Sequence, residues 1–131
     1  MSKSERLRVL FVEDDPEIAQ MYKLKLELDE YEVAVAPDGE KALKMASSSP
    51  FDLIFLDIRL PGLDGLAVLE KLRSQKQTHW TPVVILSNYS EPELVERGMK
   101  LGALEYLIKS QTSPAGVARK IPGWAGVRAE S

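Results

Sequence analysis

Charged and polar side chains follow four short apolar segments of the chain, each at the point where the segment ends. They are Glu13, Asp14 and Asp15 after the first segment, Asp57 after the second, Ser87 and Asn88 after the third, and Lys109 after the fourth. Carboxylates that are crowded together repel one another, so such a cluster is costly unless a cation fills it. Carboxylate, carbonyl and water oxygens are the ligands that suit Mg²⁺. If the fold brings these side chains together, we therefore expect a magnesium site.

The same residue types also suit the transfer of a phosphoryl group. A carboxylate beside a bound cation can act as a nucleophile toward phosphorus. The charge that develops on the phosphoryl oxygens is stabilised by a metal ion, a lysine and a hydroxyl donor. Taken singly, each residue has a common structural role; an acid after a strand often caps the next helix, and Asp15 is expected to do so. Only the joint pattern indicates phosphoryl chemistry.

Five short segments are predicted to be β-strands because they are rich in apolar residues and bounded by turn residues. They are residues 7–12, 31–36, 53–56, 83–86 and 105–108. The third and fourth are continuously apolar, which is typical of strands buried on both faces of a parallel sheet. The second and fifth are more mixed in polarity, which suits edge strands.

The segments between the strands have helical periodicity and recognisable start signals. Asp15, Asp38 and Asp64 are placed to cap three helices, and residues 90–93 have the spacing of a capping box for a fourth. Gly102 is placed to end that fourth helix. Strands that alternate with helices imply an open parallel sheet with helices on both faces. Ligands of such sheets bind beyond the carboxyl ends of the strands, where the charged side chains would converge.

The last helix is expected to be short and irregular. It is predicted to begin after Ser113 and to end at Ile121, because Pro122 follows and a proline interrupts a helix. Gly116 lies inside it, and glycine costs about 1 kcal/mol relative to alanine within a helix. Residues 122–131 are left as a tail.

Four side chains that do not belong to the group at the strand ends are expected to have structural roles only. Met21, Met99 and Trp124 are expected to pack in the core, because methionine and aromatic side chains at helical spacing usually do. Arg73 is expected to lie on a solvated helix face.

Composition limits the function classes further. The chain has 131 residues, the size of one domain, so we expect a single domain over residues 1–131 without a separate output domain. The absence of cysteine and the single histidine exclude disulfides, thiolate chemistry and multi-histidine zinc sites. The net charge of −3 argues against a nucleic-acid partner. The first apolar segment is too short for a signal peptide or a membrane span, so we expect a cytoplasmic protein.

Several motifs in order give the sequence a close resemblance to a known family. They are the acidic pair Glu13-Asp14, residues 57–65, Ser87 and residues 106–109. With these motifs, residues 6–121 resemble the receiver domain of two-component response regulators, of the single-domain chemotaxis type. The resemblance implies a doubly wound, flavodoxin-like (βα)5 sandwich whose five-stranded parallel sheet has the order 2-1-3-4-5.

The resemblance also implies a role for each acidic residue. Asp57 would accept a phosphoryl group from a phosphohistidine and become an aspartyl phosphate. Asp14 would bind Mg²⁺ directly, and Glu13 would bind it through a water molecule. The Asp57 carboxylate and the backbone carbonyl of Arg59 would complete the protein ligands of the metal.

Three further residues would respond to the phosphoryl group. Lys109 would pair with its oxygens, Ser87 would donate a hydrogen bond to them, and Tyr106 would turn inward when Ser87 moves. The added charge and acceptor oxygens are satisfied only if Ser87 and Lys109 close on them. Closure would repack the face formed by the fourth helix, the fifth strand and the fifth helix. The output would therefore be the binding of a partner rather than turnover.

Three positions depart from the family pattern. Ser110 stands where a proline is usual, so we expect a trans peptide bond and a different loop there. Asn88 stands where a small residue is usual, and it could hinder or bind the incoming donor. Tyr89 stands at a position that tunes the lifetime of the phosphoryl group. We predict that Tyr89 lies near Arg59 and that the two screen the phosphoryl group from water.

The function that these features predict is a phosphorylation-dependent signalling switch. A histidine kinase or a histidine phosphotransfer protein would be the donor, and a downstream protein would bind the repacked face. The alternative is an interaction module with the same fold that works without phosphorylation. A phosphatase of the haloacid-dehalogenase type would need an aspartate where Arg59 stands, and a flavin site is set aside because the acids at residues 13–15 would repel a phosphate.

Overall fold

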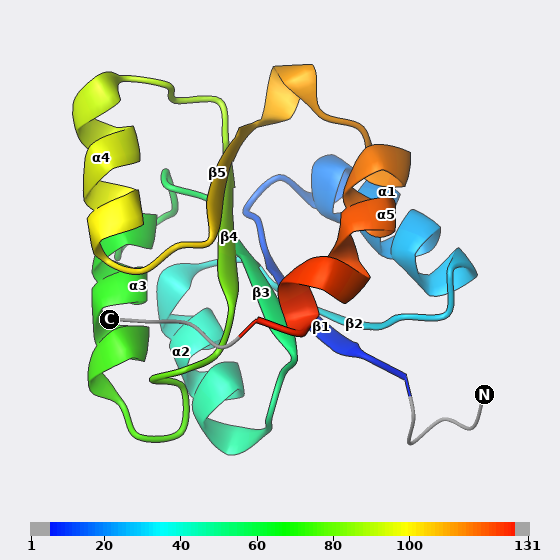
Figure 1. Ribbon diagram of the computed structural model, residues 1–131, viewed down its shortest axis with the longest axis horizontal. Helices are drawn as coiled ribbons and strands as arrows, with labels where there is room; N and C mark the ends of the chain where they lie inside the picture. The colour runs from blue at the N-terminus through cyan, green and yellow to red at the C-terminus, as the bar shows by residue number, and fades with distance from the viewer. Residues whose placement is uncertain (1–5, 128–131) are drawn as a thin grey trace.

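The computed structural model describes residues 6–127, in which five strands alternate with five α-helices (Figure 1). The strands are β1 (Arg8–Val12), β2 (Glu32–Ala36), β3 (Leu53–Leu56), β4 (Val83–Ser87) and β5 (Glu105–Ile108). The helices are α1 (Pro16–Leu28), α2 (Gly39–Ser48), α3 (Gly65–Ser74), α4 (Pro92–Lys100) and α5 (Pro114–Ala125), with a 3₁₀ turn, η2 (Lys109–Gln111), before α5. The predicted α/β class is confirmed.

The five strands form one parallel sheet in the order β2-β1-β3-β4-β5, as predicted. Helices α1 and α5 cover one face, and α2, α3 and α4 cover the other (Figure 1). The inner strands β3 and β4 are buried throughout, whereas β2 and β5 at the two edges are only partly buried. The difference in polarity between these segments therefore reports their place in the sheet.

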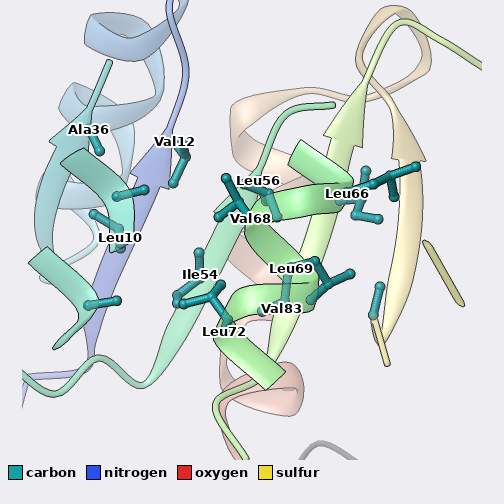
Figure 2. Packing of buried hydrophobic residues seen from close by; sticks show 14 of the residues in the cluster. Leu10, Val12, Ala36, Ile54, Leu56, Leu66, Val68, Leu69, Leu72 and Val83 are labelled. Atoms are coloured by element: carbon teal, nitrogen blue, oxygen red, sulfur yellow. The ribbon is translucent and has the colours of Figure 1, made fainter. Parts of the chain in front are cut away.

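Two core clusters hold the helices to the sheet. On the α2–α3 side, Leu10 of β1 and Ile54 of β3 belong to one cluster with Leu69 of α3 (Figure 2). On the other side, the Trp124 ring of α5 packs edge-on against Phe55 of β3, with ring centroids 5.8 Å apart. The core position predicted for Trp124 is thus confirmed. Each fully buried large apolar side chain contributes about 1.5–3 kcal/mol, so the sheet is a firm support for the loops at its edge.

The strand register places the chemistry-bearing residues side by side at the carboxyl edge of the sheet. Val12 at the end of β1 pairs with Leu56 at the end of β3, and Ser87 of β4 pairs with Ile108 of β5. The N–H of Asp57 continues the ladder by donating to the Val12 carbonyl at 3.2 Å. The residues that follow β1, β3, β4 and β5 therefore lie along one edge of the sheet.

Three predicted helix caps are confirmed and one is wrong. The carboxylates of Asp15, Asp38 and Asp64 accept hydrogen bonds from N–H groups in the first turns of α1, α2 and α3. The capping box predicted for α4 does not form, because the helix begins at Pro92 with Glu91 at the N-cap position and without a side-chain cap bond. A proline is strongly favoured at the first helical position, so it sets the start of α4 in place of the serine before it.

The last helix is longer than predicted. It continues through Pro122 to Ala125, so the end predicted at the residue before the proline is wrong. Pro122 has no N–H to donate to the Ala118 carbonyl, its partner in a regular helix. The Tyr31 hydroxyl donates to that carbonyl at 3.3 Å instead, which lets the helix pass the proline. Residues 128–131 of the predicted tail lie outside the described residues.

Arg73 is buried rather than solvated, which corrects the prediction for α3. Its side chain is among the buried polar groups, and it donates to the carbonyls of Thr78, Thr81 and Gly102 at 3.3, 2.8 and 3.1 Å. Burial lowers the pKa of its guanidinium. Gly102 follows α4 with a φ of 98°, as expected for the glycine that ends a helix. Arg73 therefore joins the loop before β4 to the turn before β5.

Two helices expose more apolar surface than predicted. Met21 and Met99, expected in the core, are 48% and 43% exposed on the outer sides of α1 and α4. Leu24 and Leu28 continue the exposed surface of α1. Periodicity predicted the helices correctly but not the width of the face that the sheet covers. Within residues 6–127, no helix is long and apolar enough to cross a membrane.

The contacts of Arg73 predict a large loss of stability when its side chain is replaced. Arg73→Met keeps the apolar stem but leaves the four carbonyls that Arg73 binds, that of His79 included, without their donor, so we expect the free energy of unfolding to fall by about 2–4 kcal/mol. Lys71→Met, on the exposed side of the same helix, should change it by less than about 0.5 kcal/mol. Urea denaturation measures both variants, and equal stabilities would contradict the role given to Arg73.

Candidate functional site

The carboxyl edge of the sheet holds a pocket of about 280 Å³. Its lining side chains come from the ends of four strands and the start of α1, and they are Glu13, Asp14, Asp15, Ile18, Asp57, Arg59, Asn88, Tyr89 and Lys109. Seven of the predicted site residues therefore meet at one place. The other two lie beside the pocket: Ser87 is fully buried at the end of β4, and Tyr106 is partly buried in β5.

Three carboxylates gather in the pocket. One oxygen from each of Glu13, Asp14 and Asp57 lies within 4.8 Å of the others. Glu13 and Asp57 are buried and Asp14 is exposed, while Asp15 caps α1 as expected. Oxygen donors at this spacing, two of them removed from water, fit a hard divalent cation such as Mg²⁺. The structure thus brings the predicted carboxylate ligands together, and the role of the Arg59 carbonyl stays a prediction.

Lys109 already supplies one positive charge to these acids. Its Nζ lies 2.7 Å from Asp57 Oδ2 and also forms an ion pair with Glu13 Oε1. Burial alone would lower the pKa of Lys109, but the hydrogen bonds and charges of Asp57 and Glu13 outweigh it, so the pKa is raised. Lys109 and Ser110 lie in η2, and the peptide bond between them is trans, as predicted. The ammonium is therefore fixed in its charged form against the acids.

Glu13 is held from two sides although it is buried. Its Oε2 accepts a hydrogen bond from the Asp15 N–H at 3.1 Å, and its Oε1 faces the Lys109 ammonium. Burial raises the pKa of Glu13 and outweighs the opposing effect of Lys109 and of the backbone bond. The carboxylate is thus poorly solvated and would gain from a second cation in the pocket.

Asp57 is anchored so that both of its carboxylate oxygens have defined partners. Oδ1 accepts a hydrogen bond from the Ile58 N–H at 2.7 Å, and Oδ2 accepts one from Lys109 Nζ at 2.7 Å. Behind it, Gly65 at the start of α3 comes so close that an added Cβ would lie 1.9 Å from the Asp57 carbonyl oxygen. The glycine lets α3 begin directly against the strand end and keeps the loop after Asp57 closed.

Ser87 and Tyr106 are joined through the backbone of Tyr89. The Tyr89 N–H donates to Ser87 Oγ at 3.1 Å, and the Tyr106 hydroxyl donates to the Tyr89 carbonyl. The Tyr106 ring packs against the core cluster on the α2–α3 side, where Gly98 of α4 leaves room for it. Burial raises the pKa of the Tyr106 phenol, so the phenol is a donor at neutral pH. The two residues predicted to report phosphorylation are therefore linked through one residue.

Arg59 and Tyr89 form a stacked pair at the mouth of the pocket. The Arg59 guanidinium lies over the Tyr89 ring, 4.5 Å from its centroid. Both side chains are exposed, and both line the pocket beside Asn88. The predicted proximity of Arg59 and Tyr89 is thus confirmed, whereas their effect on the phosphoryl group stays a prediction.

Two features of the site were not predicted from the sequence. The ion pair of Glu13 with Lys109 was not predicted, because Glu13 was assigned to the metal alone. Gly65 was named only within the motif of residues 57–65, so its close approach to the Asp57 carbonyl was not predicted.

Comparisons with known proteins agree with this geometry. The profile of the response regulator receiver domain family matches residues 9–119. The transcriptional regulatory protein CpxR of Escherichia coli K12 is 41% identical over 113 residues, which cover 86% of this chain and 47% of CpxR. This chain spans less than half the length of the curated relatives it matches.

Two solved structures have the same fold. The chemotaxis protein CheY4 of Vibrio cholerae aligns with a TM-score of 0.84 and 31% identity, over 91% of this chain and 98% of that one. The receiver domain of the sensor histidine kinase PA1611 of Pseudomonas aeruginosa PAO1 aligns with a TM-score of 0.83 and 28% identity, over 92% and 98% of the two chains. That structure holds a magnesium ion in its active-site cleft.

The close approach of Gly65 to Asp57 predicts that this glycine cannot be enlarged. Gly65→Ala should lower the free energy of unfolding by about 2–4 kcal/mol, because the added Cβ meets backbone that cannot turn aside. Gly123→Ala in α5 is the control, since its Cβ would have no heavy atom within 4 Å. The control should be as stable as the parent or slightly more stable. Thermal denaturation compares them, and a Gly65→Ala protein of unchanged stability would contradict the packing described.

Proposed function

This chain belongs to the response regulator receiver domain family, and on that premise we propose that it is a phosphorylation-dependent signalling switch with Asp57 as the phosphoacceptor. The observation that carries the proposal is the position of the Lys109 ammonium, 2.7 Å from a buried Asp57 carboxylate and in one pocket with Glu13 and Asp14. Asp57 can act as the nucleophile, and the fixed ammonium beside it offsets the negative charge of the phosphoryl group. The proposed donor is a histidine kinase or a histidine phosphotransfer protein.

Mg²⁺ is the cofactor that these residues fit. Glu13, Asp14 and Asp57 would hold it, together with the Arg59 carbonyl, and the magnesium described for the PA1611 receiver supports this choice. When bound, the ion supplies positive charge beside the phosphoryl oxygens. The protein's own contacts orient the Asp57 carboxylate, hold the Lys109 ammonium beside it and keep Ser87 buried at the end of β4.

The transfer step needs Asp57 as a free carboxylate. One of its oxygens attacks the phosphorus of the phosphohistidine, a P–O bond forms, and the P–N bond breaks. The bonding electrons stay on the imidazole nitrogen, which becomes protonated. The Lys109 ammonium is close enough to Asp57 to pair with the new phosphoryl oxygens without leaving the pocket. This chain would thus catalyse only its own phosphorylation and dephosphorylation.

The response to phosphorylation would begin at Ser87. Its Oγ accepts the Tyr89 N–H, and its own O–H is a donor that would turn to a phosphoryl oxygen. Movement of Ser87 would pull on Tyr89 and so on Tyr106, whose hydroxyl holds the Tyr89 carbonyl. Coupling of about 1–3 kcal/mol is typical of such switches.

The surface formed by α4, β5 and α5 is the proposed output. Of the residues in α4 only Gly98 is buried, and the helix has no side-chain cap at its start, so α4 is weakly held. A downstream protein that binds this surface in one state would read the phosphorylation of Asp57. We propose that the chain is a single receiver domain; a cytoplasmic location and the lack of a nucleic-acid partner stay predictions.

Phosphorylation at Asp57 is tested by incubation with acetyl phosphate, with and without Mg²⁺, followed by intact mass spectrometry. The parent chain should gain one phosphoryl group in the presence of Mg²⁺, and Asp57→Asn should gain none. Asp38→Asn, which replaces a half-buried helix cap by an equally good one, should behave like the parent. An unmodified parent chain under every condition would favour the interaction module that works without phosphorylation.

The Arg59–Tyr89 pair is proposed to screen the phosphoryl group from water. Tyr89→Ala removes the ring that Arg59 covers, so we expect the phosphoryl group to be lost about three- to tenfold faster. Trp80→Ala is the control, because Trp80 is an exposed aromatic residue before β4, at the opposite end of the sheet. The decay of the phosphorylated form, followed by intact mass after the donor is removed, gives both rates. Equal rates for Tyr89→Ala and the parent would contradict the screening role.

A further inference from the structure

The hydroxyl of Tyr106 contacts the residue that carries the ring of the Arg59–Tyr89 pair, and the role of Tyr106 as a reporter of phosphorylation does not account for that position. Its hydroxyl donates to the backbone carbonyl of Tyr89, while its ring packs against the core beside Gly98 of α4. The ring therefore belongs to the α4–β5 side of the molecule and the hydroxyl belongs to the loop after β4. Tyr106 spans the distance between the proposed output surface and the pocket.

Tyr89 is held at three points, and each leads to a different part of the site. Its N–H donates to Ser87 Oγ at 3.1 Å, its carbonyl accepts from Tyr106, and its ring lies under the Arg59 guanidinium at 4.5 Å. A stacked pair of exposed side chains is weak without further support. The two backbone hydrogen bonds fix the residue that carries the ring, so they determine where the pair lies.

We propose that Tyr106 is a positioning residue for the Arg59–Tyr89 pair, and that its hydroxyl thereby lengthens the lifetime of the phosphoryl group on Asp57. The proposal rests on the proposed function of Asp57. In dephosphorylation, water attacks the phosphorus and the P–O bond to the Asp57 carboxylate breaks, which yields the free carboxylate, inorganic phosphate and a proton. Tyr106 touches none of the reacting atoms. It acts by holding closed the side of the pocket through which water reaches them.

The consequence is a link between the output surface and the lifetime of the signal. A change on the α4–β5 side that moves the Tyr106 hydroxyl away would release the Tyr89 carbonyl and loosen the Arg59–Tyr89 pair at the mouth of the pocket. Two hydrogen bonds fix the backbone of Tyr89. Without the Tyr106 hydroxyl, only the bond from the Tyr89 N–H to Ser87 Oγ remains.

The test is a double-mutant cycle on the rate at which the phosphoryl group is lost. After phosphorylation with acetyl phosphate and Mg²⁺ and removal of the donor, Tyr106→Phe should decay about fivefold faster than the parent, the factor expected for one neutral hydrogen bond. In a Tyr89→Ala background the same change should have no further effect, because no ring is left to position. A Tyr106→Phe rate equal to the parent rate, or an equal acceleration in both backgrounds, would overturn the proposal.

A second readout does not need phosphorylation. The Arg59 side-chain NMR signals of the unphosphorylated chain should be shifted by the Tyr89 ring current and should move toward the values of a free arginine in Tyr106→Phe. Tyr31→Phe is the matched control, because it also removes a hydroxyl that donates to a backbone carbonyl, that of Ala118 in α5. It should leave the Arg59 signals and the decay rate unchanged. Unmoved Arg59 signals in Tyr106→Phe would overturn the positional link, while failure of the chain to be phosphorylated would overturn only the proposed function.

Discussion

The contact of one ammonium with two buried carboxylates is the interaction on which the site depends. Asp57 and Glu13 are 6% and 2% exposed, and carboxylates so far from water lack the solvation of their charge unless a cation faces them. Lys109 faces both, and the raised pKa of its own ammonium shows that the acids outweigh its burial. Asp57 thus stays beside a permanent positive charge, although 52 positions of sequence separate it from Lys109. The pocket forms because β4 pairs with β3 on one side and with β5 on the other, so the residues after all three strands lie along one edge of the sheet.

The same arrangement explains how a charge added in the pocket can affect the loop after β4 and helix α4. Parallel register ends β1, β3, β4 and β5 at one edge, so an added group on Asp57 meets residues from all of them. The loop after β4 is held by Ser87 on one side and by Tyr106 on the other. Beyond it, α4 is anchored chiefly by the close approach of Gly98 to Ile85, where an added Cβ would lie 2.6 Å from Ile85 Cδ1. The buried sheet therefore supports the acids, and α4, the helix with the fewest buried residues, lies next to Ser87 and Tyr106.

Local signals in the sequence predicted most of the fold, and contacts between distant segments account for what they missed. Buried strands and helix caps are short-range features, and the inner strands and the caps Asp15 and Asp38 were read correctly. Arg73 was misplaced because its partners are backbone carbonyls, which leave no mark in the sequence. The end of α5 was misplaced because the hydroxyl that compensates Pro122 comes from Tyr31, far away in the chain. The side chains that line the pocket were named in advance except for Ile18, but the pairing of Glu13 with Lys109 depends on side-chain geometry.

The central claim is that Asp57, Lys109 and Ser87 close around a phosphoryl group. A crystal structure of the chain grown with Mg²⁺ and beryllofluoride, a phosphoryl mimic, tests it most directly. The account predicts beryllofluoride on an Asp57 carboxylate oxygen, with Lys109 Nζ and Ser87 Oγ within hydrogen-bonding distance of its fluorines and Mg²⁺ beside Asp14. A structure in which Asp57 stays unmodified and Lys109 still joins it to Glu13, under conditions that saturate the pocket with both reagents, would contradict it.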